Sequence, residues 1–383
     1  MLVVDAAYFT LPYDLHFCRA LAGAGAEVEL IGRPLRAYEA AADEPYPIRP
    51  LFYRLSESGG GWRTTPAMKL LKGFEHMAGL VALERLARKV RPDIIHLQWL
   101  VLPILDIPML RRLRRRSGLV LTAHNSTLAA HKTARGLSNV GVAAQQTGRG
   151  KVLELFDGFI AHTEQTRAHL EGQGVEPDRI RVIPHPPLDL RDVPAAPADG
   201  VVRVLLFGSL KPYKGLSILV RAALDLLPAR EHCRIDVVGR PFMAVDDERE
   251  TIAAAGLSHR FGFDLRYIPD DVLARYLAAA DIVVFPYLQI DASGAFALAV
   301  AAGKPIVASR VGVFAESPAA EHVELVPPGD AKALAIALAR LVDDAAARRE
   351  LASRTRALNA TVASWPAFAA SCLDFYRQRL AAR

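Results

Sequence analysis

Two lysines stand in a short loop whose residue types suit the binding of a phosphate group. The loop, residues 208–215, reads Gly-Ser-Leu-Lys-Pro-Tyr-Lys-Gly and lies between an apolar segment and a helical pattern. A stiff Pro-Tyr pair separates Lys211 from Lys214, so both ammonium groups can lie on one side of the loop. Their charge adds to the positive end of the helix that follows, which attracts anions. The same residues are also compatible with two surface lysines in a polar loop.

Ser293 and Gly294 indicate a second element that could bind an anion. Ser293 can cap a helix that begins near Gly294, and Gly294 leaves the backbone amides open because it has no side chain. The helix that follows is rich in alanine and almost wholly apolar, which indicates burial. The alternative is an ordinary capped core helix. Two such elements in one domain favour an anion site.

Both elements belong to an alternating series of short apolar segments and longer helical ones. In the first half, strands are expected at residues 2–5, 27–31, 94–97, 120–123, 158–161 and 180–183, and helices at 15–24, 69–90, 110–116 and 151–156. In the second half, strands are expected at 202–207, 235–238, 265–268, 282–285, 305–308 and 322–326, and helices at 215–227, 270–280, 295–302 and 331–342. This alternation predicts an α/β fold with two Rossmann-like, doubly wound parallel-sheet domains facing a cleft.

A proline-rich segment divides the chain. Residues 184–200 hold five prolines and few large apolar residues, which is typical of a linker. We therefore expect domains at residues 1–186 and 201–364, joined by a linker at 187–200. A helix at 351–362 is expected to end before Trp365-Pro366. A last amphipathic helix at 367–380, within residues 365–383, is expected to cross back to the first domain; a simple terminal helix of the second domain is the alternative.

The composition limits the class of protein. Hydrophobic residues make up 51% of the 383 residues and charged residues 23%, which excludes a disordered chain. No apolar run reaches the roughly 18–20 residues that span a bilayer, and no basic segment precedes the first apolar one as in a signal peptide. Cys18, Cys233 and Cys372 show neither disulfide nor metal spacing, so a cytoplasmic location is expected.

The positive charge is concentrated in the first half of the chain. The net charge is +6, and residues 1–190 contain 24 Lys and Arg against 19 Asp and Glu. An arginine-rich run at 111–116 and a loop at 55–63 that carries Trp62 suggest contact with the anionic inner face of the cytoplasmic membrane. A solvated helix end explains the run equally simply. No aromatic-basic interleaving or known module indicates nucleic-acid binding.

The order and spacing of several blocks resemble the family 4 glycosyltransferases, which have the GT-B fold. Residues 208–215 are similar to the family's Gly-x-x-(basic)-Pro-Tyr-Lys-Gly variant. The further blocks are Val-Val-Gly at 237–239, Tyr-Ile-Pro-Asp-Asp at 267–271, Ala-Asp-Ile-Val-Val-Phe-Pro-Tyr at 280–287, Gly-Lys-Pro-Ile-Val-Ala-Ser at 303–309 and Val-Gly-Val-Phe-Ala-Glu at 311–316. The first half matches less closely, at 15–28, Pro-Asp-Ile-Ile-His at 92–96 and Leu-Thr-Ala-His-Asn at 121–125.

The resemblance implies transfer of a hexose-type sugar from a nucleotide-diphosphate sugar to a glycan or lipid-linked acceptor. It implies catalytic roles for His124, Lys211 and Lys214, with His124 facing the transferred sugar. The residues implied to bind the donor diphosphate are Gly208, Ser209, Lys211, Lys214, Ser293, Gly294 and Ala295. Those near the nucleotide are Gly239, Arg240, Tyr267 and Ile268. Candidates for contact with the sugar or the acceptor are Asp14, His16, His96, Asn125, Asp291 and Glu316.

This sequence departs from the family at the donor site. Many members carry two glutamates around the second anion element, and Ile290 and Leu298 stand at those positions here. Asp291 is one residue away, and recognition of the ribose must differ. Ser209 replaces the usual arginine, a role that Lys211 can take over. The glycine pair of the first domain is also absent, and Leu-Pro-Tyr-Asp occupies that region, at 11–14.

The implied reaction retains the anomeric configuration and uses no metal. Fixed positive groups stabilise the departing diphosphate, while the acceptor hydroxyl attacks from the leaving-group side and gives its proton to the departing phosphate. No Asp-x-Asp metal motif is found, and no cofactor is expected. An inverting enzyme would need a base such as Asp14 or His16, although capping of the first helix explains both residues. His124 is also compatible with a core or turn histidine.

Two other classes of protein remain open. A non-catalytic glycosyltransferase-like subunit would explain the missing glutamates but not the lysines. A sugar-nucleotide epimerase of the same architecture would need acid and base carboxylates, and no convincing set is found. The absence of a Gly-x-Gly-x-x-Gly motif after residues 2–5 argues against a dehydrogenase.

Overall fold

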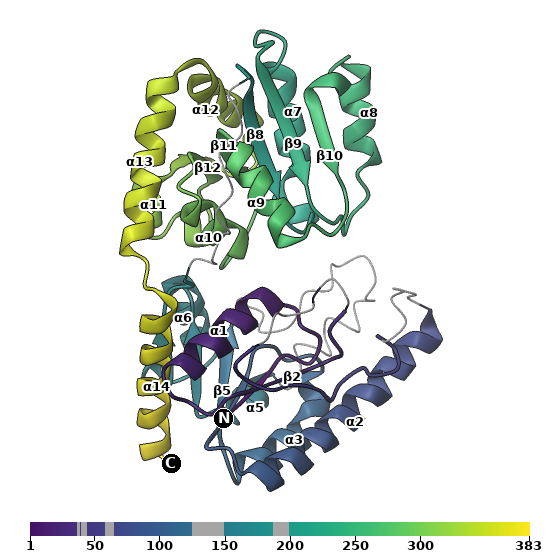
Figure 1. Cartoon of the computed structure of the whole chain (residues 1–383), viewed down its shortest axis with the longest axis vertical. Helices are drawn as coiled ribbons and strands as arrows, with labels where there is room; N and C mark the ends of the chain where they lie inside the picture. Colours follow the sequence, from purple (N-terminus) through teal and green to yellow (C-terminus); the bar gives the residue numbers. More distant parts are fainter. Residues whose placement is uncertain (37–38, 40–43, 58–64, 125–148, 187–198) are drawn as a thin grey trace. The chain divides into compact units, whose positions relative to one another are not determined.

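The computed structural model describes residues 1–36, 39, 44–57, 65–124, 149–186 and 199–383. It consists of two compact units (Figure 1). Unit 1 comprises Met1–Pro184 together with Ser364–Arg383, and unit 2 comprises His185–Ala363. Each unit is built on one sheet in which all paired strands are parallel, so the predicted pair of Rossmann-like α/β domains is confirmed. Most of the predicted linker, residues 187–198, lies outside the described residues.

Unit 1 contains a sheet with the strand order β3-β2-β1-β4-β5-β6-β7. Its strands are β1 (Leu2–Val4), β2 (Glu29–Gly32), β3 (Ile48–Pro50), β4 (Ile94–Leu97), β5 (Gly118–Ala123), β6 (Gly158–Ala161) and β7 (Ile180–Val182). Its helices are α1 (Leu11–Gly23), α2 (Pro66–Val90), α3 (Pro103–Arg114), α5 (Arg149–Leu153), α6 (Glu164–Gly172) and α14 (Trp365–Ala381), with the 3-10 turn η2 (Pro177–Arg179). Because all strands are parallel, their carboxyl ends meet at one edge, where ligands of such sheets bind.

The helices of unit 1 form two groups. α2 packs beside α3, and α14 packs beside α1 and against β5 and β6. Side chains of β4 alternate accordingly: Ile95 belongs to the core that also contains Leu83 of α2, whereas His96 contacts Tyr376 of α14. The last helix of the chain is therefore an integral part of unit 1.

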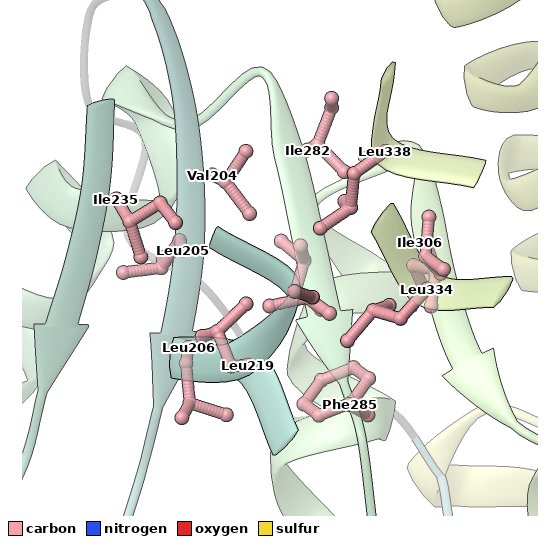
Figure 2. Packing of buried hydrophobic residues seen from close by; sticks show 14 of the residues in the cluster. Val204, Leu205, Leu206, Leu219, Ile235, Ile282, Phe285, Ile306, Leu334 and Leu338 are labelled. Carbon is pink, nitrogen blue, oxygen red and sulfur yellow. The ribbon is translucent and has the colours of Figure 1, made fainter. Parts of the chain in front are cut away.

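Unit 2 contains a sheet with the order β10-β9-β8-β11-β12-β13. Its strands are β8 (Val202–Phe207), β9 (Cys233–Val238), β10 (Phe261–Asp264), β11 (Ile282–Phe285), β12 (Ile306–Ser309) and β13 (Glu324–Val326). Its helices are α7 (Leu216–Leu226), α8 (Asp246–Ala254), α9 (Asp270–Ala279), α10 (Gly294–Ala301), α11 (Ala319–His322), α12 (Ala331–Asp343) and α13 (Ala345–Thr361), with the 3-10 turns η3 (Pro212–Lys214), η4 (Ser258–Arg260) and η5 (Gly312–Phe314). Figure 2 shows side chains of β8, β9, β11, β12, α7 and α12 interleaved in its core.

Several predicted boundaries are wrong for identifiable reasons. The strand expected at 265–268 lies one segment earlier, at β10, where Phe261 is buried and pairs beside Ile235; the apolar residues after it form the loop that leads to α9. The break before Trp365-Pro366 is present, but α3 and α14 begin at Pro103 and Trp365, earlier than the expected 110 and 367. Pro103 and Pro366 lie in the first turns of these helices, where the missing N–H of proline removes no intrahelical hydrogen bond. The short edge strand β3 and the polar helices α6 and α8 were missed because few of their residues are buried.

Candidate functional site

The turn between β8 and α7 is held by close contacts of the backbone. The chain leaves β8 at Gly208 and enters α7 through η3 and Gly215. Gly215 has φ +71°, and a Cβ there would lie 1.9 Å from the carbonyl oxygen of Pro286. Gly239, after β9, has φ +138°, and a Cβ there would lie 2.1 Å from the carbonyl oxygen of Gly208. The loops after β8, β9 and β11 therefore touch backbone to backbone, which only glycine permits at these two positions.

Lys214 is a buried cation in this turn, with 7% of its surface exposed. Its Nζ lies 5.1 Å from the centroid of the Tyr287 ring. No ion pair between Lys214 and a carboxylate occurs among the described residues. Burial lowers the pKa of Lys214 to about 7, and the charge of Lys211 shifts it in the same direction. A buried ammonium that lacks a counter-ion is unfavourable, and a bound anion would supply one.

Lys211 adds a second positive charge beside the first. It is half-buried, its Nζ lies 6.0 Å from the centroid of the Tyr213 ring, and burial lowers its pKa. Ser209, in the same loop, is exposed. The two lysines repel each other, since the charge of Lys211 contributes to the lowered pKa of Lys214. Two like charges held together at a strand end suit a ligand that carries two negative charges, such as a diphosphate.

The N-terminus of α10 lies close to the ammonium group of Lys214. Ser293 caps this helix by accepting a hydrogen bond on Oγ from the Phe296 amide at 3.2 Å. A Cβ added to Gly294 would meet no atom within 4 Å, so the first turn is open. A Cβ added to Gly208 would lie 2.9 Å from the Nζ of Lys214 and 3.7 Å from the Cβ of Ala295. The ammonium group and the helix N-terminus therefore converge, and the predicted elements of the anion site come together.

The two residues that stand in place of the missing glutamates have apolar surroundings. Ile290 and Leu298 are partly buried and pack against the core of unit 2. Asp291 lies near the lysine loop, because its charge adds to the effect of burial in raising the pKa of Tyr213. Glu316 follows η5, is half-buried, and accepts a hydrogen bond from the Ala320 amide through its backbone oxygen. The carboxylate of Asp291 therefore lies close enough to the lysine loop to remain a candidate for contact with the sugar.

The predicted nucleotide-binding residues lie on the next loops along the same edge. The Leu210 amide donates to the carbonyl oxygen of Arg240, which joins the loops after β8 and β9. The Arg240 guanidinium lies over the ring of Phe242 at 5.4 Å, and that ring is 42% exposed. Tyr267 and Ile268 follow β10, and Tyr267 is 40% exposed. Phe242 was missed from the sequence, although its place just after a strand end was a usable signal.

In unit 1, aromatic side chains surround His124 at the carboxyl edge of the sheet. The His124 ring stacks on Trp99 at 4.9 Å and meets the edge of Tyr13 at 5.0 Å. Its Nε2 lies 2.9 Å from Oε1 of Gln98, which is completely buried. Trp99 donates through Nε1 to the hydroxyl of Thr10. Gln98 and Trp99 were missed from the sequence, although they directly follow β4. Asn125 lies outside the described residues, as do residues 58–63 of the Trp62 loop.

Asp14 does not fulfil either role expected of it. It is completely buried, and burial together with the neighbouring Asp5 raises the pKa of Asp14 well above its ordinary value. Both effects favour the neutral carboxyl group over the carboxylate that a base requires. Asp14 does not cap α1, because the Thr10 amide at the start of that helix donates to Asp5. His16 bonds the carbonyl oxygen of Pro12 through Nδ1 and stacks on Trp365.

His96 is a packing residue, and its predicted contact with sugar or acceptor is wrong. It is completely buried. Its Nδ1 lies 2.5 Å from the hydroxyl of Tyr376, and its Nε2 lies 2.7 Å from the hydroxyl of Thr122. Burial, with a smaller contribution from His162, lowers the pKa of His96 to about 3. The neutral ring thus joins α14 to the sheet, and both of its nitrogens are occupied.

None of the described helices combines the length and the apolar character needed to cross a bilayer.

Comparison with known proteins agrees with this architecture. A family model described as "Glycosyltransferase Family 4" matches residues 15–186, and one described as "Glycosyl transferases group 1" matches residues 202–344. The structure of sucrose-phosphate synthase from Thermosynechococcus elongatus superposes with a TM-score of 0.76 at 24% identity, over 100% of this chain and 99% of that one. The fold thus defines a two-domain α/β protein of the GT-B type. The chain belongs to family 4 of the glycosyltransferases.

Curated relatives match part of the chain. It is 29% identical over 267 residues to a D-inositol 3-phosphate glycosyltransferase of Nocardioides sp., covering 62% of this chain and 57% of that protein. It is 35% identical over 126 residues to a GDP-mannose:glycolipid 4-beta-D-mannosyltransferase of Xanthomonas campestris pv. campestris, covering 33% of this chain and 34% of that protein. The chain therefore spans just over half the length of the first relative and a third of the second.

Proposed function

We propose that this protein transfers a hexose-type sugar from a nucleotide-diphosphate sugar to a glycan or lipid-linked acceptor. The observation that carries the proposal is the buried Lys214, which converges with the start of α10. The residues that the structure describes offer Lys214 no carboxylate partner. The name of one relative, GDP-mannose:glycolipid 4-beta-D-mannosyltransferase, supports both the donor class and a lipid-linked acceptor. The aromatic side chains around His124 in unit 1 form the proposed acceptor side.

In the proposed mechanism, the main contribution of the protein to catalysis is stabilisation of the leaving group. As the bond between the anomeric carbon and the diphosphate oxygen breaks, its electron pair passes to the diphosphate. Lys211, Lys214 and the first amides of α10 are fixed positive groups that stabilise this charge as it develops. The acceptor hydroxyl oxygen bonds to the anomeric carbon from the same side and passes its proton to the departing phosphate. The configuration is then retained without a protein nucleophile.

The direct test is release of nucleoside diphosphate from UDP-, GDP- and TDP-sugars by the isolated chain, with and without EDTA. The proposal expects turnover of at least one donor at the same rate in both conditions, because the lysines and α10 supply the positive charge. A rate that EDTA abolishes and Mg²⁺ restores would contradict the metal-independent part. Absence of turnover with every donor would favour the second candidate, a non-catalytic subunit, which the apolar Ile290 and Leu298 support.

Binding of the donor is expected to weaken as the pH rises above about 7. The free protein then loses the proton of Lys214, whereas the complex needs it, so each pH unit above that pKa lowers the affinity by up to about tenfold. A nucleotide sugar is a suitable probe because its diphosphate does not titrate in this range. Titration calorimetry at pH 6 and pH 9 should show a difference of about 30-fold to 100-fold in Kd. Lys214→Arg stays charged and should flatten this profile; a flat profile in the unmodified protein would contradict the account.

Gln98→Leu is expected to lower kcat/KM by about fivefold through His124. The Oε1 of Gln98 lies 2.9 Å from the Nε2 of His124, and one hydrogen bond contributes about 1 kcal/mol. Gln98→Glu keeps an acceptor oxygen at that position and should retain more activity than Gln98→Leu. Steady-state kinetics with saturating donor would check this, and equal losses in both variants would contradict a positioning role.

A further inference from the structure

α2 carries a row of large apolar side chains that face solvent. Leu70 and Phe74 are 67% and 75% exposed, and Met77 and Val81 are each 37% exposed. Their spacing of four, three and four residues places them on one side of the helix. The other side of α2 packs into unit 1, where Leu83 is buried. The helix is therefore apolar on two sides, and unit 1 covers only one of them.

α3 repeats this pattern beside α2 (Figure 1). Ile104 and Leu105, in its first turn, are 41% and 52% exposed. α2 joins β3 to β4 and α3 joins β4 to β5. The two helices therefore begin at the same edge of the sheet, the edge that carries Trp99 and His124. Trp99 precedes Ile104 by only five positions, so the exposed apolar residues lie next to the proposed acceptor side.

Arginines occupy the exposed surface of the second half of each helix. Arg85 of α2, Arg111 and Arg112 of α3, and Arg115 at the C-cap of α3 are exposed. Over the part of the chain that the structure describes, none of these four forms an ion pair with a carboxylate. They follow the apolar residues along each helix, so one face presents apolar groups first and uncompensated positive charge after them.

Acidic side chains of α2 do not neutralise this face. Glu84 is buried and pairs with Arg88 and Arg116. Glu75 accepts hydrogen bonds from the backbone amides of Leu55 and Ser56. Both carboxylates are thus engaged within unit 1, and the exposed face remains positive.

We propose that this surface, formed by Leu70, Phe74, Met77, Val81, Ile104, Leu105, Arg85, Arg111, Arg112 and Arg115 and named the α2–α3 face, docks on an anionic lipid bilayer. An apolar row flanked by arginines matches a bilayer surface, where acyl chains lie beneath anionic phosphates. A second copy of the chain would bring two faces of like charge together. The inference rests on the proposed lipid-linked acceptor, which the bilayer would present beside Trp99 and His124.

The test is flotation of the full chain with vesicles of phosphatidylcholine alone or with phosphatidylglycerol, at low salt. The unmodified protein should float with the anionic vesicles. The triple variant Leu70→Ser, Phe74→Ser, Met77→Ser should lose at least about tenfold in the partition coefficient. The triple variant Arg111→Gln, Arg112→Gln, Arg115→Gln should lose binding to anionic vesicles by about fivefold for each charge removed, and its binding should depend less on salt.

Ile336→Ser is the matched control, since Ile336 is an apolar residue 63% exposed on α12 of unit 2. It should float like the unmodified protein. Nucleotide-sugar binding should be unchanged in every variant. A variant that binds the donor normally but no longer floats has therefore lost only the membrane contact of the α2–α3 face. Flotation of the serine variant at the unmodified level would overturn the inference, as would conversion of a dimer to a monomer by those substitutions without any vesicle binding.

Discussion

Lys214→Met is expected to lower kcat by about 10²–10³-fold, as removal of one fixed charge-stabilising group does in other enzymes. The same variant is expected to be more stable than the unmodified protein, because it removes a buried ammonium for which no ion pair occurs among the described residues. Burial lowers the pKa of Lys214 from 10.5 to about 7. That shift corresponds to a gain on the order of 5 kcal/mol in the free energy of unfolding below pH 7.

The sign of the pH dependence follows from the direction of this shift. Below about pH 7 the lysine is charged in both the folded and the unfolded chain, so the full cost of burying it is present. Between pH 7 and pH 10.5 the unfolded chain binds the proton that the folded chain lacks, so stability rises with pH. Urea unfolding at pH 6.5 and pH 9 should therefore show the advantage of Lys214→Met shrinking as the pH rises. A variant that is less stable than the parent at pH 6.5 would contradict this account.

Lys304→Met is the matched control for Lys214→Met. Lys304 is also a partly buried lysine of unit 2, but its ammonium donates to the carbonyl oxygens of Ala278 and Ala280, both at 2.8 Å. Its removal leaves acceptors unsatisfied, so stability should fall by about 1–3 kcal/mol while kcat stays near normal. The two substitutions should thus change stability in opposite directions.

Gly215→Ala is expected to destabilise unit 2 by about 3 kcal/mol or more. Gly215 has φ +71°, and the added Cβ would lie 1.9 Å from the carbonyl oxygen of Pro286. Gly215 and Pro286 lie where the lysine loop touches the loop after β11, so relief of the clash must move the loop that carries Lys214. Donor binding should therefore be lost together with stability, as measured by urea unfolding and by titration calorimetry.

Gly256→Ala measures the cost of the backbone conformation in the absence of a steric clash. Gly256 also has φ +71°, but an added Cβ would meet no atom within 4 Å. The free energy of unfolding of this variant should fall by only about 1 kcal/mol, the usual cost of that conformation for alanine. Equal losses in the two variants would show that the contact with Pro286 is unimportant.

The elements of the candidate anion site could be located from the sequence because their signals are local. The glycines and lysines of residues 208–215 and the cap at Ser293 lie just after strands that apolar runs identify, and ends of parallel strands meet at one edge. The ring of Tyr287 below Lys214 could not be predicted in that way. Its position depends on how the loop after β11 packs against η3, which is a tertiary contact without a local pattern.

Two histidines of unit 1 show that a position at the end of a strand does not by itself predict a functional side chain. His96 and His124 both lie at or after adjacent strands, yet His96 points into the core and bonds Tyr376. That partner is 280 residues away in the sequence, on a helix whose packing decides which face of the sheet is covered. β10 was misplaced for a similar reason, since an edge strand such as Phe261–Asp264 is defined by its neighbour more than by its own composition.

The central claim is that Lys214 and the start of α10 bind the diphosphate of a sugar nucleotide. Titration calorimetry of UDP-, GDP- and TDP-sugars at pH 6.5, with the unmodified protein and with Lys214→Met, tests it most directly. The account predicts that at least one donor binds and that the substitution weakens its Kd by about 30-fold, the effect of one charged hydrogen bond. Equal affinity in the two proteins, or no binding of any donor to the unmodified protein, would contradict it.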